Sequence, residues 1–269
     1  MIIDSHVHIG QIDKFNMPES MVIESMKKYN IDFSLVSNIE GIEVDCEQHI
    51  IDREYAYTQT EANRKVIEFA KANKDKIGVL LWAKPRSEGC TEEFEKMIID
   101  NIDVVYGIKI HPYHSDIPFD SKEVEKYIKL ADRYNLPILT HTAADRNSQC
   151  KKVYMMAEKY KNVNFIMGHM GLETDNKEAI ELIAKLPNLY GDTAWVDPEH
   201  VIEMIRKYGS DKILFGTDNP IDGVDTYAHP TVCNIYLSNR FKQELSKIDY
   251  ENIMFKNAIK LFNLKVINI

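Results

Sequence analysis

The amino-acid sequence predicts a single α/β domain over residues 1–269 with the architecture of a closed (β/α)8 barrel. Short apolar segments typical of strands alternate with amphipathic segments typical of helices, and this alternation implies parallel pairing of the strands. Eight such units of roughly 33 residues match the size of a closed barrel. An open, doubly wound sheet would instead predict a G-x-G-x-x-G turn after an early strand, and the sequence contains none.

The strands are predicted from runs rich in β-branched and aliphatic residues that end at a polar residue or a proline. In chain order they cover residues 2–9, 31–37, 77–83, 104–111, 136–141, 163–169, 188–193 and 212–218. Residues 38–56 are mixed and acidic, and we expect them to form an insertion loop over one end of the barrel.

The helices are predicted from apolar residues that recur every three or four positions. In residues 121–134, for example, Val124, Ile128 and Ala131 share one face after a Ser121 N-cap. The other helices between strands are expected at residues 18–29, 58–73, 91–101, 148–160, 175–186 and 198–208. Two further helical segments are expected near residues 231–246 and 250–262.

Composition and charge exclude several classes of protein. The formal net charge of −9 argues against a nucleic-acid surface, which needs a clustered basic patch. No apolar run approaches the roughly 20 residues that cross a bilayer, and a strand that begins at Ile2 leaves no room for a signal peptide. The four cysteines lie far apart without a Cys-x-x-Cys pair, which indicates neither a zinc knuckle nor a disulfide framework. We therefore expect a reduced, cytoplasmic setting.

Histidines and one aspartate gather at the ends of the predicted strands. His6 and His8 point to the same side of the first strand, about 7 Å apart, because strand side chains alternate between faces. The other strand ends carry His111, His141, His169 and Asp218. In a barrel these carboxyl ends open onto one rim, where active sites lie. Five of nine histidines at strand ends therefore predict a functional cluster.

Neutral imidazoles together with one carboxylate suit a divalent cation. Zinc is the first choice for such a set, and manganese, iron, cobalt or nickel would also fit. A bound cation of this kind lowers the pKa of a water ligand toward neutrality, and a carboxylate beside it can accept the remaining proton.

Motifs at these strand ends resemble the amidohydrolase superfamily of TIM-barrel enzymes, and within it the amidohydrolase-related, or type 2, branch. They are His6-Val7-His8, Gly107-Ile108-Lys109-Ile110-His111-Pro112, Pro137-Ile138-Leu139-Thr140-His141-Thr142, Gly168-His169-Met170-Gly171 and Phe215-Gly216-Thr217-Asp218-Asn219-Pro220. The Asn257-Ala258 pair ahead of Leu261-Phe262 is similar to the last helix of that family. The resemblance runs from residue 1 to about residue 264.

The resemblance implies that His6, His8, His141 and Asp218 bind one metal ion and that Asp218 also accepts the proton of the attacking water. His169 would bind that water and polarise the substrate, or would bind a second metal. Lys109 could bridge two metals after carboxylation, or pair its ammonium with a ligand carboxylate. Since the Ile-His-Pro that follows Lys109 is the pattern of mononuclear relatives, we favour one metal.

Other residues at the same rim have weaker signals. His111 is expected to line the substrate pocket, and His114 in the following loop to be solvated. Trp195 would hold a substrate ring or merely cap the barrel. Arg146 is a candidate carboxylate anchor, although an exposed helix-start arginine is the favoured interpretation. Asp4 or Asp192 could orient a ligand imidazole, and the acidic residues 40–54 form a solvated face or a lid.

Three functions follow from these residues. The leading one is a metal-dependent hydrolase that uses a metal-activated water to cleave an amide, cyclic amide, lactone or ester bond of a small molecule. The alternative is a non-oxidative decarboxylase of an aromatic or enoic acid; relatives of that kind tend to be longer, which favours hydrolysis. The third is a non-catalytic metal-binding barrel, against which the intact ligand set argues. The expected partner is a small-molecule substrate, without nucleic acid or membrane, and a homodimer is a possible assembly.

Overall fold

The structure, a computed structural model, describes residues 1–52, 54–229 and 235–264. Within these residues nine strands form one sheet in the order β2-β1-β3-β4-β5-β6-β7-β8-β9. The strands are β1 (Ile3–Ile12), β2 (Phe15–Met17), β3 (Phe33–Asn38), β4 (Ile77–Trp82), β5 (Val105–Ile110), β6 (Ile138–Ala143), β7 (Phe165–Leu172), β8 (Leu189–Asp192) and β9 (Ile213–Leu214). All neighbours pair in parallel except β2, which pairs antiparallel with β1.

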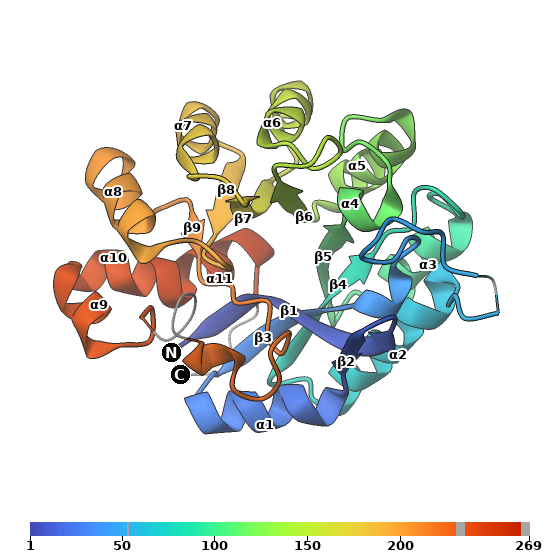
Figure 1. The fold of residues 1–269 in the computed structure, drawn as a ribbon, viewed down its shortest axis with the longest axis horizontal. Helices are drawn as coiled ribbons and strands as arrows, with labels where there is room; N and C mark the ends of the chain where they lie inside the picture. The colour runs from blue at the N-terminus through green and yellow to red at the C-terminus, as the bar shows by residue number, and fades with distance from the viewer. Residues whose placement is uncertain (53, 230–234, 265–269) are drawn as a thin grey trace.

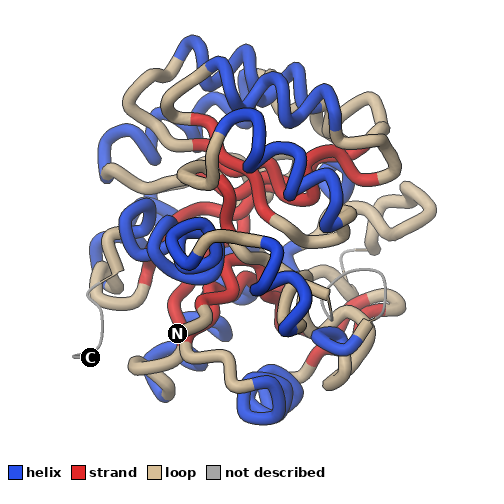
Figure 2. Tube along the Cα trace, turned by 90° about the vertical axis from the view of Figure 1, so that its left-hand side faces the viewer, coloured by secondary structure: helices blue, strands red, loops and turns tan. Residues whose placement is uncertain are grey.

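The segment after β9 closes the sheet onto β1. Ser5 N–H donates to Phe215 O, Asp218 N–H to His6 O and His8 N–H to Asn219 O, each at 2.9 Å. Eight parallel strands therefore form a closed ring, with the helices outside it (Figures 1 and 2). The predicted (β/α)8 barrel is confirmed.

The helices form the outer layer. They are α1 (Glu19–Tyr29), α2 (Gln59–Ala72), α3 (Glu92–Asp100), α4 (Pro112–Ser115), α5 (Lys122–Tyr134), α6 (Cys150–Lys159), α7 (Lys177–Lys185), α8 (Pro198–Tyr208), α9 (Asn239–Glu244), α10 (Lys247–Glu251) and α11 (Asn257–Phe262). Short helical turns occupy η1 (Ile39–Gly41), η2 (Thr226–Ala228) and η3 (Asn252–Lys256). The Ser121 side chain accepts from Val124 N–H, so the predicted N-cap of α5 is confirmed.

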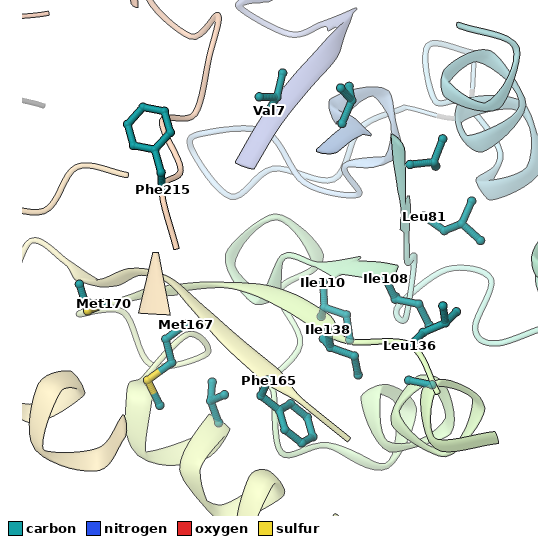
Figure 3. Close-up of a cluster of buried hydrophobic side chains, with 14 of the residues drawn as sticks. Val7, Leu81, Ile108, Ile110, Leu136, Ile138, Phe165, Met167, Met170 and Phe215 are labelled. Atoms are coloured by element: carbon teal, nitrogen blue, oxygen red, sulfur yellow. The ribbon is translucent and has the colours of Figure 1, made fainter. Parts of the chain in front are cut away.

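Strand alternation decides which side chains face the barrel interior. Val7 packs outward in a large apolar cluster between sheet and helices, as do Ile108 and Ile110, which flank Lys109 (Figure 3). His6, His8 and Lys109 therefore point inward. Deeper in the barrel a second apolar cluster joins the strand residues Leu80, Leu139 and Ile166 to Ala258 and Phe262 of α11. Apolar packing thus fills the end of the barrel opposite the histidine rim.

The prediction missed a hairpin and misjudged three segments. β1 continues to Ile12 and turns back as β2, whereas the predicted strand ended at Ile9. Residues 39–44 are buried rather than part of a solvated acidic face. β9 is only two residues long, because the chain beyond it bonds to β1 irregularly. Of the helix expected at 231–246, residues 231–234 lie outside the described residues, and the described part is helical only in α9.

Removing a ring from the layer between sheet and helices is expected to destabilise the barrel. Phe165 is fully buried, so Phe165→Ala should lower the free energy of unfolding by about 3–5 kcal/mol through lost burial and a residual cavity. Urea denaturation measures this change. Ile102→Ala is the control, because Ile102 is 62% exposed and its truncation should cost about 0.5 kcal/mol or less. Equal effects of the two substitutions would contradict the assignment of Phe165 to the core.

A transmembrane helix is not found in the described part of the chain, where every helix is too short or too polar to span a bilayer.

Candidate metal centre

The structure brings the predicted histidines and aspartate together at the carboxyl rim. The donors come from β1, β6, β7 and the segment after β9. Asp218 Oδ1 lies 3.0 Å from His8 Nε2 and 3.2 Å from His6 Nε2. The ring of His169 is 5.0 Å from that of His6 and 4.8 Å from that of His141, measured between centroids. Ligand atoms of His6, His169 and Asp218 all lie within 4.8 Å of one another, so these side chains can reach a common ion.

Hydrogen bonds behind the rings fix three of these imidazoles. They join His6 Nδ1 to Asp192 Oδ2 at 2.8 Å, His8 Nδ1 to Ser37 Oγ at 2.9 Å and His169 Nδ1 to Ala194 O at 3.1 Å. A carbonyl oxygen only accepts, so His169 Nδ1 carries the proton and its Nε2 presents a lone pair. No hydrogen-bond partner for the His141 ring occurs among the described residues. The ring nitrogens of His141 are therefore available to a cation, while the His111 and His169 rings pack against the ring itself.

Charge and burial place these groups in the protonation states that metal ligands need. Burial lowers the pKa of His6, His8 and His141 below that of a free imidazole, and the charge of Lys109 lowers it further. Burial alone would raise the pKa of Asp218, but the adjacent His6, His169 and His8 imidazoles bring it well below the usual carboxyl value. Neutral imidazoles thus face an ionised carboxylate. This donor set fits a divalent metal ion.

Lys109 on β5 is the central cation of the site. It is fully buried, and its Nζ lies 2.6 Å from His6 Nε2. Burial lowers the pKa of Lys109 to about 8, against the opposing charges of Asp218 and Asp192. Among the described residues that line the surrounding cavity, it is the only lysine or arginine.

The cavity over this cluster has a volume of about 290 Å³. Its walls combine apolar side chains with further polar ones. The apolar residues are Phe15, Met17, Ile39, Ala143, Leu172 and Ile221, and the polar ones besides Lys109 and the donor cluster are His111, Tyr113, His114, Asp145 and Glu173. Phe15 and Met17 belong to the hairpin that the sequence analysis missed. The only signal for that hairpin was the polar Asp13-Lys14 pair between apolar residues.

His111 and His114 form one wall of the cavity. The His111 ring stacks on His141, with centroids 4.1 Å apart and planes 13° from parallel, and also stacks with Trp82 at a centroid distance of 5.7 Å. His111 Nδ1 accepts from His114 N–H at 3.3 Å, and His114 Nδ1 donates to Val44 O at 2.9 Å. The prediction of a solvated His114 was wrong, because α4 turns its ring inward and burial lowers its pKa.

Four other rim residues that the sequence singled out have defined partners. Asp192 bonds to the His6 ring, as described above. Asp4 accepts from His6 N–H at 3.1 Å and from the Tyr227 and Thr217 hydroxyls, so it holds the β1 backbone rather than a ring. Arg146 is 83% exposed and pairs with Asp116, which agrees with the exposed interpretation. Trp195 Nε1–H donates to Asp218 Oδ2 at 3.0 Å, and Trp195 is not among the described residues that line the cavity.

A closed parallel barrel with histidines and an aspartate at its carboxyl rim defines a class of metal-dependent barrel enzymes. The chain belongs to the amidohydrolase family, because the family described as Amidohydrolase matches residues 3–264. The family resemblance inferred from the motifs is confirmed. Among curated proteins, none matches the chain in sequence.

Solved structures share the fold at low sequence identity. 2,6-Dihydroxybenzoate decarboxylase from Rhizobium is 15% identical with a TM-score of 0.66, over 97% of this chain and 98% of that chain. A 5-carboxyvanillate decarboxylase from Novosphingobium aromaticivorans, solved with bound manganese, is 14% identical with a TM-score of 0.70, over 98% and 97%. A protein described as amidohydrolase II is 16% identical with a TM-score of 0.66, over 98% and 100%. Each match spans nearly all of both chains, the two decarboxylases included. The expectation that decarboxylases of this family are longer than this chain, which favoured hydrolysis, therefore finds no support in these matches.

Proposed function

We propose that this protein is a metal-dependent, non-oxidative decarboxylase of a small aromatic or enoic acid. The observation that carries the proposal is Lys109, a buried cation beside His6 and the only lysine or arginine among the described cavity residues. A substrate carboxylate needs such a partner, because an unpaired charge is costly in a buried site. The decarboxylases among the solved structures with this fold support the same chemistry.

We propose that His6, His8, His141 and Asp218 hold one divalent metal. A metal in that position would supply a Lewis acid that binds and polarises the substrate. Manganese is the first ion to test, because decarboxylases of this fold were solved with it, and zinc is the second. A single ion is the simpler arrangement, since Lys109 Nζ contacts His6 rather than bridging two groups of ligands.

The cavity suits a substrate with one ring. Its volume of about 290 Å³ is at the small end of ligand sites. Among its lining residues the Phe15 side chain offers a flat surface for stacking. Because His111 Nδ1 accepts a hydrogen bond, its Nε2 carries the proton and can donate to a polar substituent of the substrate.

In this proposal the bond between the ring carbon and the carboxyl carbon breaks, the electron pair stays on the ring carbon and CO2 leaves. A proton must then reach that carbon. His169 is the proposed carrier: its Nδ1–H is held by Ala194 O, so its Nε2 can first take a proton from solvent and then pass that proton to the ring carbon. Asp218 is less suited to deliver it, since both of its oxygens already have partners.

The second candidate is the metal-dependent hydrolase. The family description supports it, and so does the ionised Asp218, which could accept a proton from an attacking water. In a hydrolase Lys109 would only neutralise the site, and a substrate carboxylate would not be needed.

The products distinguish the two candidates. Protein loaded with manganese should release labelled CO2 from 2,6-dihydroxybenzoate or 5-carboxyvanillate that carries ¹³C in the carboxyl group, and a chelator should stop the release. The same protein should leave an aromatic lactone such as dihydrocoumarin intact. If the protein hydrolysed the lactone and released no CO2 from either acid, the proposed decarboxylase function would be wrong and the hydrolase function would take its place. Turnover of neither class would favour the non-catalytic barrel.

A further inference from the structure

The end of β8 and the turn after it, residues 192–195, contact two proposed metal ligands, His6 and Asp218, and the proposed proton carrier His169. The contacts are Asp192 Oδ2 with His6 Nδ1 (2.8 Å), Ala194 O with His169 Nδ1 (3.1 Å) and Trp195 Nε1 with Asp218 Oδ2 (3.0 Å). Thr193 ties this turn to β9 and the segment after it, because its N–H donates to Leu214 O at 3.0 Å and its hydroxyl to Gly216 O at 2.9 Å. The turn is therefore a fixed support beneath the site.

The two carboxylate oxygens of Asp218 have different partners, and the indole of Trp195 binds one of them. Oδ1 faces His6 Nε2 and His8 Nε2, while Oδ2 receives the indole N–H. An indole nitrogen can only donate, so this contact holds a carboxylate oxygen that carries no proton. Without it, the carboxylate could rotate about its own bond and turn its lone pairs away from the imidazoles.

The backbone on both sides of this bond is held in an uncommon conformation. Trp195 has φ +60° and Asp218 has φ +64°. Left-handed backbone is rare outside glycine and is an outlier for a bulky residue, and such strain persists only where surrounding structure enforces it. At these two positions it aims the indole and the carboxylate at each other. The backbone conformation of both residues therefore fixes this contact, unlike a contact of a mobile surface side chain.

We propose that Trp195 is a positioning residue that orients Asp218 for metal binding. This inference rests on the proposed role of Asp218 as a ligand. It assigns Trp195 to the layer behind the metal rather than to the substrate, although the aromatic ring also packs against His229, with ring centroids 5.3 Å apart. Removal of a hydrogen-bond partner behind a ligand typically weakens metal affinity by about 10–100-fold.

The test is the affinity of the protein for Mn²⁺, measured by calorimetry on metal-free protein. Trp195→Phe keeps an aromatic ring and deletes the N–H, and it should weaken Mn²⁺ binding by at least about tenfold. Tyr236→Phe is the matched control: it deletes a hydrogen bond to Val196 O in the next part of the same segment, without touching Asp218, and should bind Mn²⁺ like the unmodified protein. Asp218→Asn is measured alongside.

The outcomes separate this inference from the proposed function. If Asp218→Asn loses Mn²⁺ but Trp195→Phe retains full affinity, the positioning role is wrong while the metal site stands. If Asp218→Asn retains full affinity, the metal assignment itself fails. If Tyr236→Phe lost as much Mn²⁺ affinity as Trp195→Phe, the loss in Trp195→Phe would reflect a general loosening of the segment, and the proposal would be overturned.

A second measurement does not depend on the folding of Trp195→Phe. The chain has two tryptophans, and the Trp82 indole N–H is buried without a hydrogen-bond partner among the described residues. In NMR spectra of metal-free protein, the Trp195 indole proton should resonate downfield of the Trp82 proton and move on Asp218→Asn, whereas Trp82 should not move. A Trp195 signal that ignores Asp218→Asn would contradict the contact.

Discussion

Asp218→Asn is expected to remove the bound metal and abolish turnover while the barrel stays folded. The substitution keeps the shape of the side chain but deletes the one negative charge of the donor set, which lies 3.0–3.2 Å from the imidazole nitrogens of His8 and His6. Three neutral imidazoles bind a divalent ion far less tightly than three imidazoles and a carboxylate, so we expect a loss in metal affinity of about 100-fold or more. Metal content after dialysis, read by mass spectrometry, measures it.

Asp222→Asn is the matched control for that substitution. It makes the same change in charge four positions away, on a side chain 43% exposed and outside the described lining of the cavity. Its metal content and thermal unfolding should equal those of the unmodified protein. Full metal and full activity in Asp218→Asn, or the same loss in both variants, would rule out Asp218 as the anionic ligand.

Lys109→Met is expected to separate metal binding from catalysis. Methionine has a similar length but no charge, so the cavity would lose the cation that we propose for the substrate carboxylate. The variant should keep its metal, because Lys109 is not a metal ligand in the proposed site. Its kcat/KM for decarboxylation should fall by about 10²–10³-fold. Steady-state kinetics together with metal content measure the two effects separately.

Lys65→Met provides the comparison for Lys109. Lys65 pairs with Glu40 at 2.7 Å and does not line the cavity, so its loss should leave kcat/KM within about twofold. If Lys109→Met decarboxylated the substrate at the rate of the unmodified protein, the carboxylate-binding role would be lost. If it instead released the metal, Lys109 would belong to the metal site, as a bridging residue would.

Much of the barrel and of the donor cluster could be predicted from the sequence because both follow from periodicity. On β1 the alternation of His6, Val7 and His8 between the two faces is a local property of a strand, and Lys109 between Ile108 and Ile110 obeys the same rule. Once strand ends share a rim, residues that end different strands must meet there. His6 and Asp218, more than 200 positions apart, were therefore placed together correctly.

The cavity wall could not be predicted because it depends on contacts between distant, irregular segments. His114 is buried where the carbonyl of Val44, seventy positions earlier, accepts its Nδ1 proton. The hairpin that brings Phe15 to the cavity turns through Asp13, which has φ +54°. Because this conformation is uncommon for a residue other than glycine, the sequence does not predict a turn there. Trp195 is a similar case: its φ of +60° accompanies an indole that faces Asp218 and does not line the cavity.

The most direct test of the account is the crystal structure of the manganese-loaded protein, with the metal located by anomalous scattering. One peak is expected, with His6, His8, His141 and Asp218 as its protein ligands at roughly 2.0–2.3 Å, and with Lys109 close by but not bound. A peak outside this cluster, or two peaks bridged by a modified Lys109, would contradict the single-metal site on which the proposed decarboxylase rests.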